Sequence, residues 1–119
     1  MLIKNKTAIA KMRVAGQGLA EILATVATHI KEGVTTLELN NWIENAMRAK
    51  GLATPCKGYA GYKYATCISL NEVVVHGVPT KEIVLKSGDF VKIDVVGSFK
   101  GYCADMARYF FVGVPTVIA

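Results

Sequence analysis

Two aspartates in the last third of the chain are spaced so that they could do chemistry together. Asp94 lies in the run FVKIDVV and Asp105 in the run GYCADMARYF, and residues 97–101 between them are typical of a β-hairpin turn. A turn centred between Phe99 and Lys100 would place the two carboxylates directly opposite each other. Like charges at a cross-strand separation of ~4.5–5.5 Å repel, so a cation in the gap would stabilise the pair. Carboxylate oxygens alone suit Mn, Mg or Ca, and added imidazole ligands extend the choice to Fe, Co and Zn.

Two other arrangements would also relieve the repulsion. Lys92 precedes Asp94 by two residues on the same face of the expected strand, diagonal to Asp105, and its ammonium group could neutralise the pair. A β-bulge could instead rotate one aspartate toward solvent. Two carboxylates are too few ligands to close a metal site. The metal hypothesis therefore needs further ligands, for which His76 and Glu72 are candidates unless they come from outside the chain.

Two helices are expected before the strands that hold these residues. Apolar residues over 7–30 recur at three- and four-residue steps, which is typical of a helix with one buried stripe, and Gly33 is its expected stop. Thr35 and Glu38 have the spacing of a capping box, which predicts a second helix that ends at Gly51. His29 falls in the last turn of the first helix, where a basic group favours the helix dipole. The expected buried stripes are Ile9, Met12, Leu19, Ile22, Leu23, Val26 and Ile30 in the first helix and Leu39, Trp42, Ile43, Ala46 and Met47 in the second.

Strands follow the helices, so the expected class is α+β, two helices followed by an antiparallel sheet. Short strands are predicted over 66–70 and 73–75, and two longer strands after the turn signal at Gly88 form the hairpin. Alternation assigns one hairpin face to the core and the other to a cleft that contains both aspartates. The core face carries Val91, Ile93, Val95, Gly97, Tyr102, Ala104 and Met106, and the cleft face carries Phe90, Lys92, Val96, Cys103, Ala107 and Tyr109.

Length and composition favour one cytoplasmic domain. The chain has 119 residues, 52% of them hydrophobic, which suffices for a single core, and the expected domain spans residues 1–119. Three cysteines at irregular spacing are not a disulfide framework and indicate a reducing compartment. The net charge is +5, but the basic residues form no clustered stripe, so no specific nucleic-acid partner is expected. No stretch has the ~20 apolar residues that a membrane helix needs.

Five runs carry a resemblance that covers nearly the whole chain in one order: KMRVAG (11–16), GVTTLEL (33–39), CKGYAGYKYATCISLNEVVVHGVP (56–79), LKSGDFVKIDV (85–95) and GYCADMARYF (101–110). They resemble the N-terminal half of the bacterial-type (type I) methionine aminopeptidases. The resemblance implies the N-terminal half of a pita-bread fold, in which two related halves surround a two-metal site. It also implies that residues 1–119 are a partial catalytic domain.

The same resemblance implies roles for three residues. Asp94 matches a ligand of one metal and Asp105 a carboxylate that bridges both, while a metal-activated water attacks the carbonyl after the initiator methionine. The metals would be two divalent ions per complete site, with Co, Mn, Fe, Zn and Ni as the candidates. His76 matches a substrate-side histidine that stabilises the tetrahedral intermediate, which suits an imidazole that titrates near neutral pH. Without the family, a structural hydrogen bond explains a histidine at a strand end equally well.

Four further residues match the family's pocket for the methionine side chain: Cys56, Tyr59, Tyr62 and Cys67. Aromatic and sulfur groups suit an unbranched, polarizable thioether. The simpler explanation is that they are ordinary buried residues of an irregular loop.

The chain departs from the family pattern at several positions. Met106 stands where Thr is common after the second aspartate, Val96 stands where a polar residue is frequent, and Ala60 replaces a loop histidine of some members. Hydrogen bonds that orient metal ligands can change metal affinity tenfold or more. The family's remaining ligands, one His and two Glu, have no counterpart in this chain, so we expect little activity from these 119 residues alone.

The function that the resemblance implies is metal-dependent removal of the initiator methionine from nascent proteins whose second residue is small. The alternatives are a proline-directed pita-bread peptidase and a non-catalytic half-domain that binds a peptide or partner. The expected partners are the N-terminal Met of nascent polypeptides and the ribosome. A monomer is expected when the protein is complete.

Overall fold

The computed structural model describes residues 6–55, 57, 64–71 and 77–113. Helix α1 (Lys6–Val26) continues into a short 3-10 turn, η1 (Ala27–His29), and is followed by helix α2 (Thr36–Ala49). Strands β1 (Thr66–Leu70), β2 (Phe90–Phe99) and β3 (Tyr102–Phe111) come after the helices. The predicted α+β order is therefore confirmed. The strand predicted over 73–75 falls outside the described residues.

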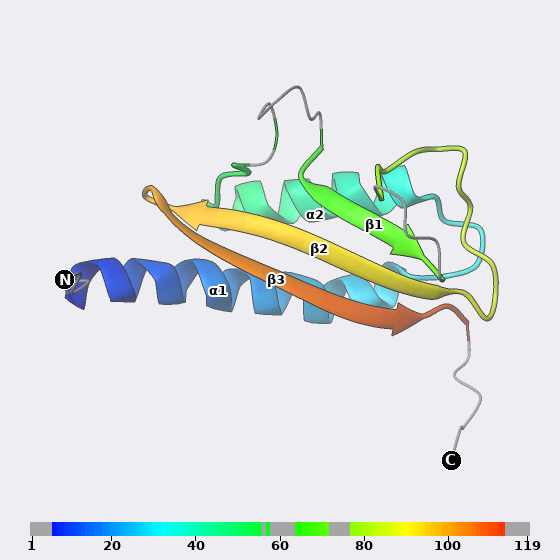
Figure 1. Ribbon diagram of the computed structural model, residues 1–119, viewed down its shortest axis with the longest axis horizontal. Helices are drawn as coiled ribbons and strands as arrows, with labels where there is room; N and C mark the ends of the chain where they lie inside the picture. Colours follow the sequence, from blue (N-terminus) through cyan, green and yellow to red (C-terminus); the bar gives the residue numbers. More distant parts are fainter. Residues whose placement is uncertain (1–5, 56, 58–63, 72–76, 114–119) are drawn as a thin grey trace, which may run out of the picture.

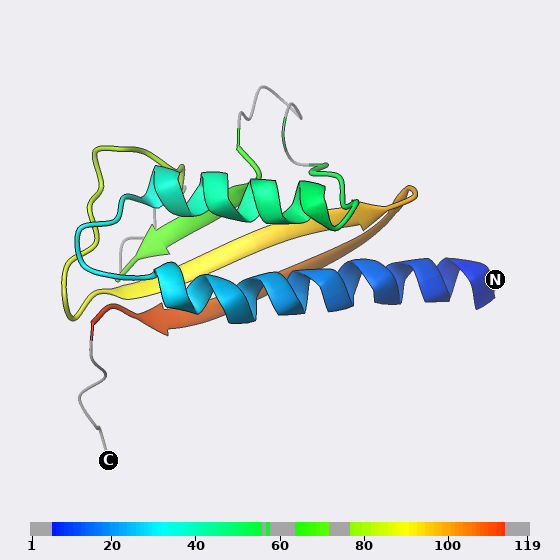
Figure 2. The same ribbon diagram turned by 180° about the vertical axis from the view of Figure 1, so that it is seen from behind.

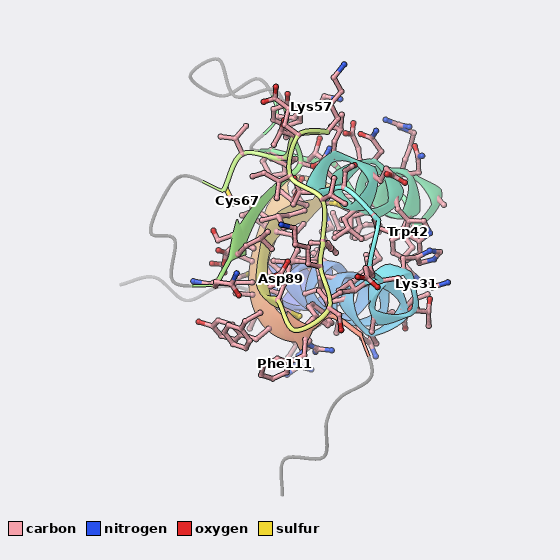
Figure 3. All side chains as sticks on the ribbon, turned by 90° about the vertical axis from the view of Figure 1, so that its right-hand side faces the viewer. Lys31, Trp42, Lys57, Cys67, Asp89 and Phe111 are labelled. Carbon is pink, nitrogen blue, oxygen red and sulfur yellow. The ribbon has the colours of Figure 1, made fainter. Side chains whose placement is uncertain are left out.

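The described chain forms two layers. The three strands make one antiparallel sheet in the order β1-β2-β3, and both helices lie against the same face of that sheet (Figures 1 and 2). Helix α1 contacts β2 and β3, whereas α2 contacts β1 and α1. Viewed along the strands, Trp42 of α2 and Cys67 of β1 lie on opposite sides of the sheet (Figure 3). No helix in the described ranges covers the second face of the sheet.

The apolar stripe of α1 holds the helix against the sheet. Leu19, Ile22, Leu23 and Val26 are at most 1% exposed, as the periodicity predicted. The prediction for Ile9 is wrong, because this side chain is 39% exposed. Ile9 follows Ala8, which is buried, and consecutive helical residues are ~100° apart around the axis, so Ile9 points to the flank of the helix. The helix ends before Gly33, which has a positive φ of 94° in the following turn.

The capping box at the start of α2 is confirmed. The Glu38 backbone N–H donates to Thr35 Oγ1 at 3.1 Å, and the Thr35 N–H donates to Glu38 Oε1 at 3.2 Å. Leu39, Ile43 and Met47 are fully buried as predicted.

Asn40 connects α2 to the first strand. It is 1% exposed, and its Oδ1 accepts hydrogen bonds from the Ala65 N–H at 3.1 Å, the Thr66 N–H at 3.1 Å and Thr66 Oγ1 at 2.8 Å. This amide therefore fixes where β1 begins and so positions Cys67, the next residue.

The hairpin turn differs from the prediction by one residue. Strands β2 and β3 are joined by Lys100 and Gly101, whose φ angles are +51° and +89°, the two left-handed positions of a type I′ turn. A turn at Phe99–Lys100 would instead force a bulky aromatic residue into the left-handed region, which Gly101 adopts without steric cost. Because the turn centre moves by one residue, every cross-strand pair moves by two.

The core lies between the helices and one face of the sheet. Val91, Ile93 and Val95 are at most 2% exposed, which confirms the core face assigned by alternation. Gly97 lets both helices approach β2 closely, because a Cβ at this position would lie 3.0 Å from Leu19 Cδ2 and from Met47 Cε.

Candidate functional site

Asp94 and Asp105 lie on the same face of the hairpin, but they do not face each other directly. Asp94 pairs with Ala107, and Asp105 pairs with Val96. The prediction of direct opposition is therefore wrong by two residues, while the prediction of a shared face is correct, because a shift by two preserves the alternation. The carboxylates are diagonal neighbours, a relationship with a typical separation of ~7–8 Å between backbone positions. A cation that joins them would have to lie above the sheet between the two strands.

Lys92 forms an ion pair with one of the two aspartates. Its Nζ lies 3.7 Å from Asp94 Oδ2, with side chains that are 40% and 46% exposed. Lys92 pairs across the strands with Tyr109 rather than lying diagonal to Asp105. The ammonium therefore reaches Asp94 alone. The alternative of a β-bulge is wrong for this hairpin, since β2 and β3 pair residue by residue from Phe90 to Phe99.

Cys67 is the residue of β1 directly paired with Asp94. It is exposed on the same face as the aspartates, and Figure 3 shows it on the side of the sheet away from the helices. The sequence did not predict that Cys67 lies beside Asp94, because this depends on the register between β1 and β2, and the two residues are 27 positions apart in the chain. Within each strand, the only signal was the alternation of side chains between the two faces.

We call the side of the sheet that no described helix covers the aspartate face. Its residues follow from the alternation and the register of the three strands. They are Cys67 and Ser69 of β1, Phe90, Lys92, Asp94, Val96 and Ser98 of β2, and Cys103, Asp105, Ala107, Tyr109 and Phe111 of β3.

The departures from the family pattern have different consequences in the fold. Val96 pairs directly with Asp105 and presents an apolar side chain beside this carboxylate. Met106 points to the opposite side of the sheet, where it is half-buried against the core. Substitution at 106 therefore changes the packing under the site, whereas Val96 removes a hydrogen-bonding neighbour of Asp105.

An aromatic cluster occupies the end of the aspartate face away from the turn. The rings of Phe90 and Tyr109 stack with centroids 5.0 Å apart, and Phe111 lies 4.9 Å from Phe90. Tyr109 and Phe111 are 56% and 58% exposed. The Lys92 ammonium lies 5.8 Å from the Tyr109 ring centroid and so links this cluster to Asp94.

Several predicted site residues lie outside the described residues. These are Cys56, Tyr59, Tyr62 and His76, together with the candidate ligand Glu72 and the departure at Ala60. The structure therefore places three of the seven predicted site residues, Cys67, Asp94 and Asp105, and all three share the aspartate face. His29 is the last residue of η1 and lies on the helix side of the sheet, with its ring centroid 4.6 Å from that of Trp42.

The described donor groups fit a divalent metal in kind but not in number. Asp94 and Asp105 offer exposed carboxylate oxygens on one surface, which are the donors that hard divalent cations take. No group of three or more His, Cys, Asp or Glu side chains in the described part of the chain is arranged to hold a metal. Among the described residues, the aspartate face thus offers suitable donor atoms but no complete ligand set.

Comparisons with known proteins identify the family and the fold of the chain. Residues 10–118 match the model of the metallopeptidase family M24. The methionine aminopeptidase of Escherichia coli strain K12 is 43% identical over 120 residues, which cover 98% of this chain and 44% of that protein. The crystal structure of methionine aminopeptidase from Thermotoga maritima superposes with a TM-score of 0.90 at 38% identity, covering 98% of this chain and 47% of that one. A Xaa-Pro dipeptidase from Bacillus anthracis gives a TM-score of 0.78 at 29% identity, covering 98% and 31%.

The two-layer α+β fold is that of the N-terminal half of a pita-bread metallopeptidase. The chain belongs to metallopeptidase family M24, as its resemblance predicted. It spans about half the length of the methionine aminopeptidases that it matches. Among the described residues, no helix is long and apolar enough to cross a membrane.

Proposed function

We propose that this chain supplies part of the active site of a metal-dependent methionine aminopeptidase, which removes the initiator methionine when the second residue is small. The observation that carries the proposal is the placement of Asp94, Asp105 and Cys67 together on the uncovered face of the sheet. Family membership supports it, as does the higher identity to the methionine aminopeptidases of Escherichia coli (43%) and Thermotoga maritima (38%) than to the Xaa-Pro dipeptidase of Bacillus anthracis (29%).

In this proposal Asp94 and Asp105 hold the metal. A divalent metal, when bound, lowers the pKa of water and polarises a substrate carbonyl. The two aspartates contribute negative charge on a rigid hairpin, which fixes the position of the ligands before the metal binds. Val96, the direct cross-strand partner of Asp105, cannot donate a hydrogen bond that would orient this carboxylate, so we expect weaker metal binding than with a polar residue at position 96.

Cys67 lines the pocket for the methionine side chain in this proposal. It is paired directly with Asp94, so a side chain that rests on the cysteine sulfur lies beside the metal ligand. A polarizable sulfur surface suits a thioether. Cys56, Tyr59 and Tyr62 complete the pocket, and His76 donates to the developing negative charge at the scissile carbonyl.

Further parts of the proposal extend to the whole protein. The complete site takes two divalent ions chosen from Co, Mn, Fe, Zn and Ni, and residues 1–119 form the N-terminal half of the catalytic domain. The substrate is the N-terminal Met of nascent polypeptides. A contact with the ribosome, a monomeric state and a cytoplasmic location remain predictions.

The substrate class can be tested with three peptides. The protein at its native length, loaded with Mn²⁺, is incubated with Met-Ala-Ser, Met-Lys-Ser and Ala-Pro-Ser, and free amino acids are measured. Methionine release from Met-Ala-Ser alone would support the proposal, and the Asp94→Asn variant should abolish it. Cleavage of Ala-Pro-Ser in preference would favour the proline-directed alternative. No cleavage of any peptide, together with peptide binding, would favour the non-catalytic half-domain.

The 119-residue chain alone should release methionine at a small fraction of that rate. Its described residues supply two carboxylates rather than a full ligand set. Turnover of Met-Ala-Ser by the purified 119-residue chain at the rate of longer relatives would contradict this expectation.

A further inference from the structure

A lysine occupies the place beside the metal-binding carboxylate that a second cation would need. Lys92 Nζ lies 3.7 Å from Asp94 Oδ2. Strand alternation puts Lys92 and Asp94 on the same face, two residues apart on β2, so the base of the lysine side chain stays beside the aspartate. The ammonium therefore remains on the aspartate face, although the side chain can rotate.

The ammonium of Lys92 has a second binding partner in the ring of Tyr109. Tyr109 is its direct cross-strand partner, and the ammonium lies 5.8 Å from the centroid of this ring. An aromatic face attracts a cation. The lysine can thus exchange the carboxylate for the ring by side-chain rotation alone, because both lie within its present reach.

Asp105 has no such partner. Among the described residues it forms no ion pair, and Lys92 is not one of its diagonal neighbours. In the described part of the chain, one aspartate of the pair therefore has a cation of the protein within ion-pairing distance, and the other has none.

We propose that Lys92 is a positioning residue that acts as an internal counter-ion: it holds Asp94 in the metal-free sheet, moves toward Tyr109 when a divalent cation binds, and so weakens metal binding. The proposal rests on the assignment of Asp94 and Asp105 as metal ligands. A charge of +1 near a charge of +2 raises the free energy of the metal-bound state, even in a water-like dielectric. Removal of the lysine charge should therefore tighten Mn²⁺ binding by about five- to tenfold at low ionic strength.

The test is a Mn²⁺ titration of the protein at its native length, with free Mn²⁺ measured by its electron paramagnetic resonance signal. The variants are Lys92→Gln, Lys92→Arg and Arg108→Gln. Arg108 is the matched control, because it lies on the same hairpin but on the opposite side of the sheet, paired with Ile93. Lys92→Gln and Arg108→Gln lower the net charge equally, so only a local effect separates them.

The expected result is tighter binding in Lys92→Gln, with Lys92→Arg and Arg108→Gln within about twofold of the unmodified chain. Equal or weaker binding in Lys92→Gln would overturn the role of Lys92. The Asp94→Asn, Asp105→Asn double variant separates this failure from failure of the metal site itself. If that double variant binds Mn²⁺ as well as the unmodified chain does, or if no Mn²⁺ binds to either, Asp94 and Asp105 are not metal ligands. The proposed role of Lys92 is then wrong as well.

Discussion

Asp94 and Asp105 are diagonal neighbours on one face of the β2–β3 hairpin, and among the residues that the structure describes only Asp94 has a cation within ion-pairing distance. The two carboxylates therefore differ in their surroundings although they share one face of the hairpin. Asp94 has Cys67 and Lys92 beside it, whereas Asp105 faces the apolar Val96. This asymmetry allows the two aspartates to be distinguished by their effects on stability.

In the absence of metal, Asp105→Asn should raise the free energy of unfolding by about 0.3–1 kcal/mol, because it removes a like charge from a neighbouring strand position. Asp94→Asn should change it by less than about 0.3 kcal/mol, since the loss of the exposed Lys92 ion pair offsets the relieved repulsion. Urea unfolding in the presence of a chelator measures both. A loss of stability in Asp105→Asn would show that its carboxylate has a stabilising partner.

Two glycines provide a matched test of the packing between the helices and the sheet. Gly97→Ala should destabilise the chain by about 1–3 kcal/mol, because the added Cβ would lie 3.0 Å from Leu19 Cδ2 and from Met47 Cε. Gly16→Ala in the middle of α1 should stabilise it by about 0.5–1 kcal/mol, since its nearest neighbour would be Ala104 Cβ at 3.9 Å and alanine favours the helix. Thermal unfolding of both variants gives the comparison. Equal effects of the same sign would contradict the observed approach of the helices to β2.

Asn40 offers a test of how β1 is held in place. Asn40→Ala should cost about 2–4 kcal/mol, because two backbone N–H groups and one hydroxyl lose their acceptor in a buried position. Asn45→Ala is the control, because Asn45 accepts only an exposed hydrogen bond from Arg48, so its loss should cost less than about 0.5 kcal/mol. Hydrogen exchange should speed up at the Ala65 and Thr66 amides in the Asn40 variant alone. Unchanged protection at those two amides would refute the role of Asn40.

The sequence predicted the elements and the faces of the hairpin better than their alignment. The capping box of Thr35 and Glu38 and the buried face of β2 follow from local chemistry and alternation, and both are observed. A register shift of two residues leaves that alternation unchanged, so the pattern cannot distinguish Ala107 from Asp105 as the partner of Asp94. The turn decides between them, through the preference of Gly101 for a positive φ.

The candidate site was predictable only in part. Residue type and spacing were enough to select Asp94 and Asp105. Across a two-residue turn, two residues whose positions differ by an odd number lie on the same face of the hairpin, so their shared face was predictable too. The pairing of Cys67 with Asp94 depends on how β1 meets β2, and the contact of Lys92 with Tyr109 depends on the corrected register. Each of these two contacts joins residues of different strands, so the pattern within one strand cannot predict it.

The register itself can be tested by a disulfide with the natural Cys103. In the observed pairing Ser98 lies directly opposite Cys103, whereas the register first expected from the sequence would place Val96 there. Directly paired residues have Cα atoms about 4.5–5.5 Å apart, within the range of a disulfide, while diagonal residues lie about 7–8 Å apart. Ser98→Cys should therefore form an internal disulfide with Cys103 on mild oxidation, and Val96→Cys should not. Mass spectrometry of the linked tryptic peptides under non-reducing conditions identifies the bond, and the unmodified chain controls for bonds that involve Cys67 or Cys56. A Val96–Cys103 linkage as the main product would show that Asp94 and Asp105 face each other directly after all.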